Sequence, residues 1–267
     1  MKSQTESVAE SYDRWAENYD DYEVNNESLA RVRKEIYKHV FAFLQPEDHI
    51  LEINAGTGTD AQYFAQNGFR VHATELSSKM VRKIDEKIKQ FDLSNLMTSQ
   101  QLSFTDLDTL DHNTYQFCFS NIGGLNCIPD IYEVAKNVPL VLSPGGIITM
   151  VIMSRICPWE WMEIFRGNYS TAIRRFHKDG ATANKNVVPY QIYYFTPGQV
   201  RTAFGSKFRL VKLQSLSLFG PPIDRKGFYA RNPGLSRALI RIDDVLTHRY
   251  PFNHWGDFFI LSLRYEP

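Results

Sequence analysis

Residues 50–61 constrain the fold of this chain more than any other segment. They read Ile-Leu-Glu-Ile-Asn-Ala-Gly-Thr-Gly-Thr-Asp-Ala, so a short hydrophobic strand runs into a turn with two glycines. Gly56 and Gly58 let the backbone approach a ligand closely. The helix expected after them offers free N–H groups at its positive end. This order of elements is typical of a site for a nucleoside cofactor.

The first 153 residues repeat this alternation of strand and helix. We expect strands at 49–54, 70–76, 99–105, 116–121 and 147–153, with helices at 29–44, 60–67, 78–91 and 129–142. Strands separated by helices require right-handed crossovers, and they therefore predict a parallel sheet.

The pattern changes after residue 153. Residues 158–177 read as an aromatic-rich helical insertion, and strands are expected at 187–195, 209–219 and 256–265, with a helix near 235–248. A strand, a long insertion and a final strand are typical of an antiparallel edge on a parallel sheet. We predict an α/β fold with a Rossmann-like doubly wound sheet, mostly parallel with an antiparallel last strand, and helical lid insertions. A single domain is expected over 1–267, with cap helices at 1–45, a cofactor-binding core at 46–154 and substrate-lid insertions at 155–195 and 220–255.

Composition narrows the class of protein further. Apolar residues make up 43% of the chain, enough for a sizeable core, and no apolar run approaches the roughly 20 residues of a membrane helix. The polar first ten residues do not resemble a secretory signal. Cys118, Cys127 and Cys157 have no metal-ligand spacing, and an odd number makes a poor disulfide framework. We expect a cytoplasmic protein.

The net charge of zero hides an asymmetry along the chain. Residues 1–150 hold 13 Lys and Arg against 22 Asp and Glu, while residues 151–267 hold 17 against 8. The basic half could face a partner, or two solvated regions could neutralise each other. The basic residues are scattered, so we expect no nucleic-acid partner.

The residues around the glycine turn point to the kind of cofactor. Glu75 follows Gly56 by 19 residues at the end of the second expected strand, where a carboxylate can accept both ribose hydroxyls. The pattern from Gly56 to Ala61 also fits the dinucleotide fingerprint. Two features distinguish this chain from that pattern. They are the acidic residue Glu52, four positions before Gly56, and the acidic segment 105–108 after the third strand.

With these features the chain resembles the class I S-adenosylmethionine (SAM) dependent methyltransferases of the small-molecule type. The resemblance covers about residues 8–153 and rests on five motifs in order: the turn at 51–58, Glu-Leu-Ser-Ser-Lys-Met at 75–80, Asp-Leu at 106–107, Phe-Ser-Asn-Ile-Gly-Gly at 119–124 and Leu-Ser-Pro-Gly-Gly at 142–146. Residues 12–20 are similar to the N-terminal helix that closes over the cofactor in many members.

The resemblance implies a role for each matching position. SAM, with S-adenosylhomocysteine (SAH) as its product, would be the cofactor. Glu75 would bind the ribose, Asp106 and the Leu107 backbone the adenine, and Tyr12 and Tyr19 would cap the site. The remaining cofactor-binding candidates, around the methionine moiety, the second motif and the sulfonium, are Glu52, Asn54, Gly56, Gly58, Leu76, Met80, Ser120 and Asn121. One departure is that Asn54 stands where the family has its first glycine; Asn tolerates left-handed backbone angles, so the turn can form.

The sequence indicates acceptor and catalytic residues less directly. Trp159 and Trp161 belong to an aromatic stripe that is either a substrate lid or core, and Arg174 with Arg175 could clamp an acid group. No dyad reads as catalytic. The candidates for a catalytic role are His177, Asn121 and Glu160.

These observations favour a methyltransferase that acts on O, N or C of a small molecule, such as an aromatic, lipid or natural-product intermediate with an acidic group. Two alternatives remain: an NAD(P)-dependent oxidoreductase that uses the same turn, and a non-catalytic SAM-binding module. We expect no metal and no membrane span, and either a monomer or a homodimer.

Overall fold

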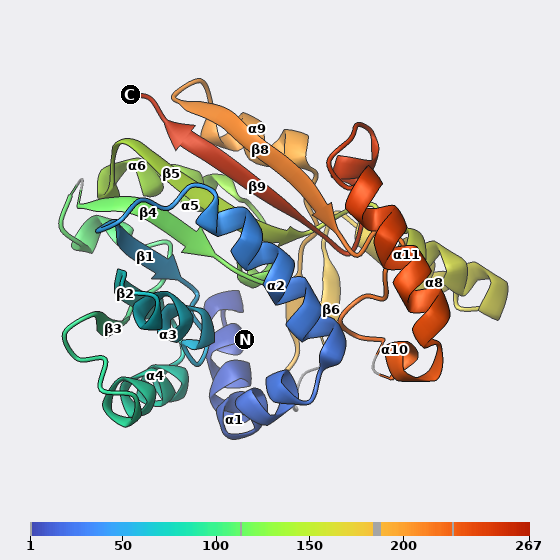
Figure 1. Ribbon diagram of the computed structural model, residues 1–267, viewed down its shortest axis with the longest axis horizontal. Helices are drawn as coiled ribbons and strands as arrows, with labels where there is room; N and C mark the ends of the chain where they lie inside the picture. Colours follow the sequence, from blue (N-terminus) through green and yellow to red (C-terminus); the bar gives the residue numbers. More distant parts are fainter. Residues whose placement is uncertain (1, 113, 184–187, 226) are drawn as a thin grey trace.

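Seven strands form one sheet in the computed structural model, which describes residues 2–112, 114–183, 188–225 and 227–267 (Figure 1). The strand order is β3-β2-β1-β4-β5-β9-β8. The strands are β1 (His49–Ile53), β2 (Arg70–Glu75), β3 (Met97–Gln101), β4 (Tyr115–Ser120), β5 (Leu142–Met153), β8 (Phe208–Leu216) and β9 (Phe258–Tyr265).

Strands β1 to β5 are parallel to one another, as the strand–helix alternation predicted. Strand β9 is antiparallel to both of its neighbours, β5 and β8. The predicted antiparallel last strand is therefore confirmed, although it lies one position inside the sheet and β8 forms the edge. All strands β1 to β5 end at the same edge, which is where ligands bind in such sheets.

Helices cover both faces of the sheet, and each face has its own apolar core. On one face, α2 (Glu27–Phe41), α3 (Thr59–Gln66) and α4 (Ser78–Gln90) pack on strand residues such as Ile50. On the other face, α5 (Tyr132–Ala135), α6 (Val138–Val141) and α9 (Pro197–Phe204) pack on strand residues such as Leu51. Because side chains alternate along a strand, Glu52 faces the α2 side of the sheet.

An N-terminal helix, α1 (Gln4–Val24), lies across the carboxyl edge of the sheet (Figure 1). Ser3 begins it with a capping box, in which its hydroxyl accepts from Glu6 N–H and the Glu6 carboxylate accepts from Ser3 N–H. Asn26 caps α2 by accepting from Leu29 N–H. The preceding residue, Asn25, ends α1, and its backbone N–H donates to the Asp21 and Glu23 carbonyls. Two adjacent asparagines therefore hold the turn between α1 and α2.

Three predicted elements differ from the observed ones. The helix expected over 129–142 is two short pieces, α5 and α6, because Pro139 has no N–H to continue α5. The strand expected at 99–105 is β3 at Met97–Gln101, since Leu102 and Phe104 leave the sheet to pack on the core. Only β7 (Tyr190–Ile192) forms within 187–195, and it pairs with β6 (Ala181–Ala183); residue 187 lies outside the described residues.

The insertion after β5 is helical, as expected, but broken into four turns. These are α7 (Pro158–Trp161), η3 (Met162–Arg166), α8 (Tyr169–Ile173) and η4 (Arg174–Phe176). They lie at one end of the molecule with α10 (Phe228–Arg231) and α11 (Pro233–Leu246) (Figure 1). Within the described ranges, no helix combines the length and apolar character needed to span a bilayer.

Candidate functional site

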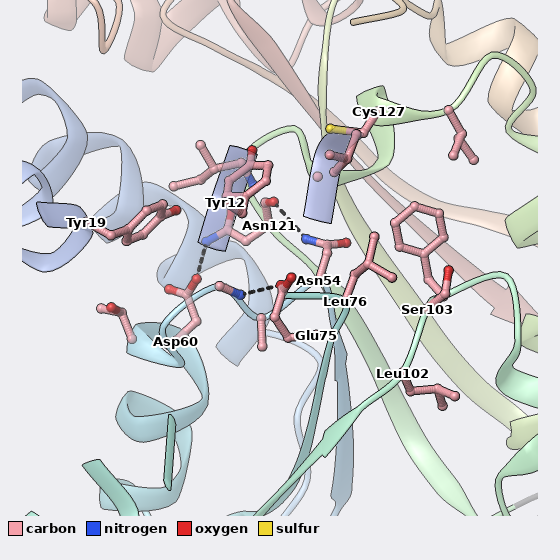
Figure 2. A pocket seen from close by; sticks show the side chains of 18 of the residues that line it. Tyr12, Tyr19, Asn54, Asp60, Glu75, Leu76, Leu102, Ser103, Asn121 and Cys127 are labelled. Carbon is pink, nitrogen blue, oxygen red and sulfur yellow. Dashed lines mark hydrogen bonds between the residues drawn. The ribbon is translucent and has the colours of Figure 1, made fainter. Parts of the chain in front are cut away.

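A cavity opens at the carboxyl ends of β1, β2 and β4, beneath α1 (Figure 2). It contains about 900 Å³ of space between protein atoms, its open mouth included. In Figure 2, Tyr19 and Asp60 lie on one side of the cavity, Leu102 and Ser103 on the other, and Asn54 and Glu75 between them. The lining therefore comes from segments far apart in the sequence.

The turn after β1 is held by the side chain of Asn54. Its backbone is left-handed, with φ of 55°, and its amide oxygen accepts from the Ser120 hydroxyl at 2.6 Å. Its amide nitrogen donates to the Asn121 carbonyl at 3.3 Å. Asn54 therefore replaces the conformational freedom of a glycine with two hydrogen bonds to the end of β4.

Glu75 is fixed at the end of β2 by backbone donors. Its carboxylate accepts from Gly56 N–H at 2.9 Å and from Ser77 N–H at 2.9 Å. Burial raises the pKa of Glu75, and these two hydrogen bonds oppose that rise. The side chain is 7% exposed, so the carboxylate is held rigidly against the glycine turn.

A chain of charged groups forms the wall on the α2 side. Arg33 donates to both carboxylate oxygens of Glu23, at 2.7 and 3.0 Å, and its Nε lies 3.0 Å from Asp60 Oδ1. Burial alone would lower the pKa of Arg33, but Asp60 and Glu23 raise it well above its ordinary value. The amide of Asn121 in turn donates to Asp60 Oδ2 at 2.7 Å (Figure 2). This network joins α1, α2, α3 and β4 around the cavity.

Helix α1 is tied down by carboxylates on its inner face. Asp13 Oδ1 accepts from the Ser77 hydroxyl at 2.5 Å. Asp20 Oδ1 accepts from the Thr57 hydroxyl at 2.5 Å and from Lys87 Nζ at 3.0 Å. We call the contacts of Asp13 and Asp20 the α1 latch. They hold α1 on the glycine turn and on α4.

Two tyrosines of α1 cover the cavity. The ring of Tyr19 lies over Gly56, where a Cβ would be only 3.6 Å from the Tyr19 hydroxyl oxygen. Tyr12 lies near Tyr190 of β7, with 6.0 Å between ring centroids. Burial raises the pKa of both Tyr12 and Tyr19 well above the ordinary value. Both phenols therefore stay protonated at neutral pH.

The cavity lining includes seven of the predicted cofactor residues. They are Tyr12, Tyr19, Asn54, Gly56, Glu75, Leu76 and Asn121. The other six do not line it: Glu52, Gly58, Met80, Leu107 and Ser120 support it from within the protein, and Asp106 is solvent-exposed one residue beyond the lining segment 102–105. Burial, and next the nearby Asp60, raise the pKa of Glu52 well above its ordinary value.

The predicted acceptor residues lie elsewhere, which corrects that part of the sequence analysis. Arg175 is 5% exposed and binds Glu160 and Asp257 inside the protein, and Arg174 also binds Glu160. Neither arginine lines the cavity, because both compensate buried carboxylates. Trp159 is buried in the core, which was one of the two interpretations of the aromatic stripe. Its indole N–H donates to the Phe219 carbonyl.

The remaining candidates are also outside the cavity. Trp161 is 38% exposed, and His177 lies on the surface after η4. Glu160 is occupied by Arg174 and Arg175, so of the catalytic candidates only Asn121 lines the cavity. Its amide is hydrogen-bonded to Asp60, and its side-chain oxygen accepts from Ile122 N–H.

Sequence reasoning missed three charged lining residues: Glu23, Arg33 and Asp60. Asp60 lies at the start of α3, directly after the glycine turn, so its position in the sequence could have identified it as a lining residue. Arg33 is a cation beside the apolar stripe of an amphipathic helix, and nothing in that pattern distinguishes it from a solvated arginine.

The fold and this cavity define a Rossmann-like enzyme whose site accepts a nucleoside cofactor. The family profile described as a methyltransferase domain matches residues 50–146, which run from β1 to the start of β5. The demethylmenaquinone methyltransferase of Listeria welshimeri is 26% identical over 187 residues, covering 67% of this chain and 73% of that protein.

Solved structures share the fold over most of the chain. Geranyl diphosphate C-methyltransferase from Streptomyces coelicolor A3(2) has a TM-score of 0.58 at 11% identity, covering 89% of this chain and 80% of the other. The 4+2 cyclase SpnF has a TM-score of 0.65 at 14% identity, covering 97% and 95%. Residues 50–146 therefore form a methyltransferase domain, and these similarities support a class I SAM-dependent methyltransferase with SAM as its cofactor.

Proposed function

We propose that this methyltransferase transfers the methyl group of SAM to a neutral, largely apolar small molecule bound under α1. The charge of the cavity carries this proposal. The lining has three carboxylates, Glu23, Asp60 and Glu75, and one guanidinium, Arg33. Such an excess of carboxylates favours the positive sulfonium and ammonium groups of SAM and disfavours an anionic acceptor.

The residues present fit SAM along the length of the cavity. Glu75 would accept from the ribose hydroxyls, and Leu76 with residues 102–105 would contain the adenine, with Asp106 just beyond them. Arg33 is the lining cation that would face the methionine carboxylate. The missing side chain of Gly56 leaves the turn open to the cofactor beneath Tyr19.

An apolar part of the lining would receive the acceptor. Val8, Ile122, Cys127 and Ile128 line the cavity, and Tyr12 packs on the cluster that contains Val8 and Cys127. The acid group expected from the basic half of the chain has no free cation here, since Arg174 and Arg175 are bound elsewhere. The acceptors in the names of two similar proteins, demethylmenaquinone and geranyl diphosphate, are both small molecules. Geranyl diphosphate is anionic, so the preference for a neutral acceptor rests on the charge of this cavity alone.

Alignment would account for most of the catalysis. SAM supplies an activated methyl group, and the enzyme must hold a nucleophile in line with it. The lining tyrosines stay protonated, and the Asn121 amide is fixed by Asp60 and Ile122 N–H. These groups position the reactants and exclude water rather than remove a proton.

The cofactor assignment is tested by calorimetric titration with SAH and NADPH. Wild type should bind SAH and not NADPH. Glu75→Gln should weaken SAH binding about 10- to 150-fold, the effect of losing charge-assisted hydrogen bonds. Glu133→Gln is the matched control, because Glu133 pairs with Lys136 on the surface of α5. Equal SAH affinity in both variants would refute the role of Glu75.

The acceptor assignment is tested with methyl-labelled SAM and pairs of acceptors that differ only in an acid group and its neutral amide. Labelling should favour the neutral member. Preference for the acid would contradict the charge argument. SAH binding with no transfer to any acceptor would favour the non-catalytic module instead.

A further inference from the structure

The insertion after β5 exposes an unusual run of large apolar side chains. We call this set the insertion patch: Trp161, Met162, Ile164, Phe165, Tyr169, Ile173 and Phe176. Phe165 is 91% exposed and Tyr169 is 65% exposed. The short helices that carry these side chains pack on one another. A cluster of exposed apolar side chains of this kind marks an interaction site, because isolated exposed apolar residues are common but clusters are not.

The exposed charges around the insertion patch are mostly basic. Glu160 and Glu163 are buried beneath arginines, Glu160 beneath Arg174 and Glu163 beneath Arg166. The side chains of Arg166 and Arg174 remain 58% and 40% exposed, and Lys178 and Asp179 are both exposed. The surface presented to solvent is therefore apolar, with more basic than acidic side chains.

A second face of the same character lies on α11. Leu235, Ile242 and Val245 are 53%, 43% and 56% exposed and follow one side of the helix, with Arg237 and Arg241 beside them. Helix α10 connects the two surfaces: it packs on α11, and its Phe228 meets Trp159 of α7 edge to face. Both faces occur at the same end of the molecule (Figure 1).

The insertion is held rigidly from below and protrudes beyond the sheet (Figure 1). Arg175 fixes it by donating to the Ser154 carbonyl after β5 and to Asp257 before β9. Strand β5 ends at the edge of the sheet where the cavity lies. A rigid protrusion of aromatic, aliphatic and basic side chains suits a deformable anionic surface, in which apolar groups enter the headgroup region and cations meet lipid phosphates.

We propose that the insertion patch docks this protein on an anionic lipid membrane surface. The side chains of Phe165, Tyr169 and Phe176 would enter the interface. Lys178 would bind the acidic headgroups, together with the exposed faces of Arg166 and Arg174, which keep their ion pairs with Glu163 and Glu160. The proposal does not depend on methyl transfer, and its test does not measure it.

The test is co-sedimentation of the full chain with vesicles of phosphatidylcholine alone or mixed with phosphatidylglycerol. Wild type should partition more strongly on the mixed vesicles, by about fivefold for each basic side chain engaged, and salt should weaken that difference. The triple variant Phe165→Ser, Tyr169→Ser, Phe176→Ser should lose at least about tenfold in partitioning, because it removes the apolar contacts.

Matched substitutions elsewhere distinguish binding through the insertion patch from nonspecific hydrophobic adsorption. Val24→Ser and Tyr132→Ser change side chains that are 83% and 54% exposed outside the insertion, and they should leave partitioning unchanged. Absence of binding to mixed vesicles, or equal losses in the triple and control variants, would overturn the proposal. A further result would also overturn the proposal: wild type forms a dimer, the triple variant does not, and neither binds vesicles. The patch would then join two copies of the chain.

Discussion

Gly124 lies directly against the side chain of Asn54: a Cβ at Gly124 would be 2.2 Å from Asn54 Nδ2. The two residues come from the turn after β1 and from η2 (Gly124–Cys127), which follows β4. The asparagine that departs from the family turn therefore has its space provided by a glycine 70 positions later.

This pair predicts a coupled effect on stability. Gly124→Ala should cost about 1–3 kcal/mol of unfolding free energy, because the new methyl group cannot fit beside Asn54. In an Asn54→Gly background the same substitution should cost much less. Urea unfolding of the four proteins of this cycle measures the coupling; additive costs would show that the residues do not compete for space.

The α1 latch predicts control of access to the cavity. Replacing Asp13 and Asp20 with Ala should increase the rate of proteolysis within α1 at least about tenfold, because their charge-assisted hydrogen bonds are lost. SAH should slow that cleavage by binding beneath α1. Glu10→Ala is the control, since within the described part of the chain Glu10 forms ion pairs only with Lys2 and Arg14, at the same end of α1. Cleavage that stays at the wild-type rate would exclude the latch.

The buried cluster below the insertion predicts a contrast between neighbouring arginines. Arg175→Met should destabilise the fold by about 3–5 kcal/mol, because Glu160 and Asp257 would become buried carboxylates without their shared cation. Arg174→Ala should cost at most about 1 kcal/mol, since that side chain is 40% exposed. Chemical denaturation of both variants checks this, and similar costs would contradict it.

His39 predicts a pH dependence of stability. It is enclosed between Gln214 of β8 and Ser262 of β9, and burial, with Lys212 nearby, lowers its pKa to about 4. The unfolded chain therefore binds this proton more readily, with a pKa near 6.5. Stability should fall as the pH drops from about 6.5 to about 4, by up to about 3 kcal/mol in total.

The matched variant for this prediction is His39→Gln, which retains a polar side chain but cannot titrate. Denaturation at pH 7, 5.5 and 4.5, chosen to span about two units around the transition, gives the difference between the two proteins. If the variant loses as much stability on acidification as wild type, His39 is not the responsible group.

The sequence predicted the parallel half of the sheet because its signals are local. The glycine turn, the position of Glu75 and the strand–helix alternation each lie within a few dozen residues. The sheet order beyond β5 was less accessible, because the pairing of β9 with both β5 and β8 depends on contacts across the long insertion. The split at Pro139 was a local signal, but the apolar pattern of 129–142 concealed it.

Seven of the thirteen candidate cofactor residues line the cavity and five support it from within the protein, for a physical reason. A motif fixes the backbone path, while exposure to a ligand depends on which way each side chain points from its strand. Glu52 and Ser120 belong to strands that end at the cavity, yet both are buried below it. The ion pairs of Arg33 join helices and a turn that no sequence pattern places together.

The position of β9 also sets an order for biosynthesis. Strand β8 pairs only with β9 among the described strands, and β9 reaches the sheet through β5. During translation, the segment Phe208–Leu216 leaves the ribosome while its hydrogen-bonding neighbour has not yet been made. Its unpaired backbone is then an edge open to pairing with other chains until Phe258–Tyr265 emerges.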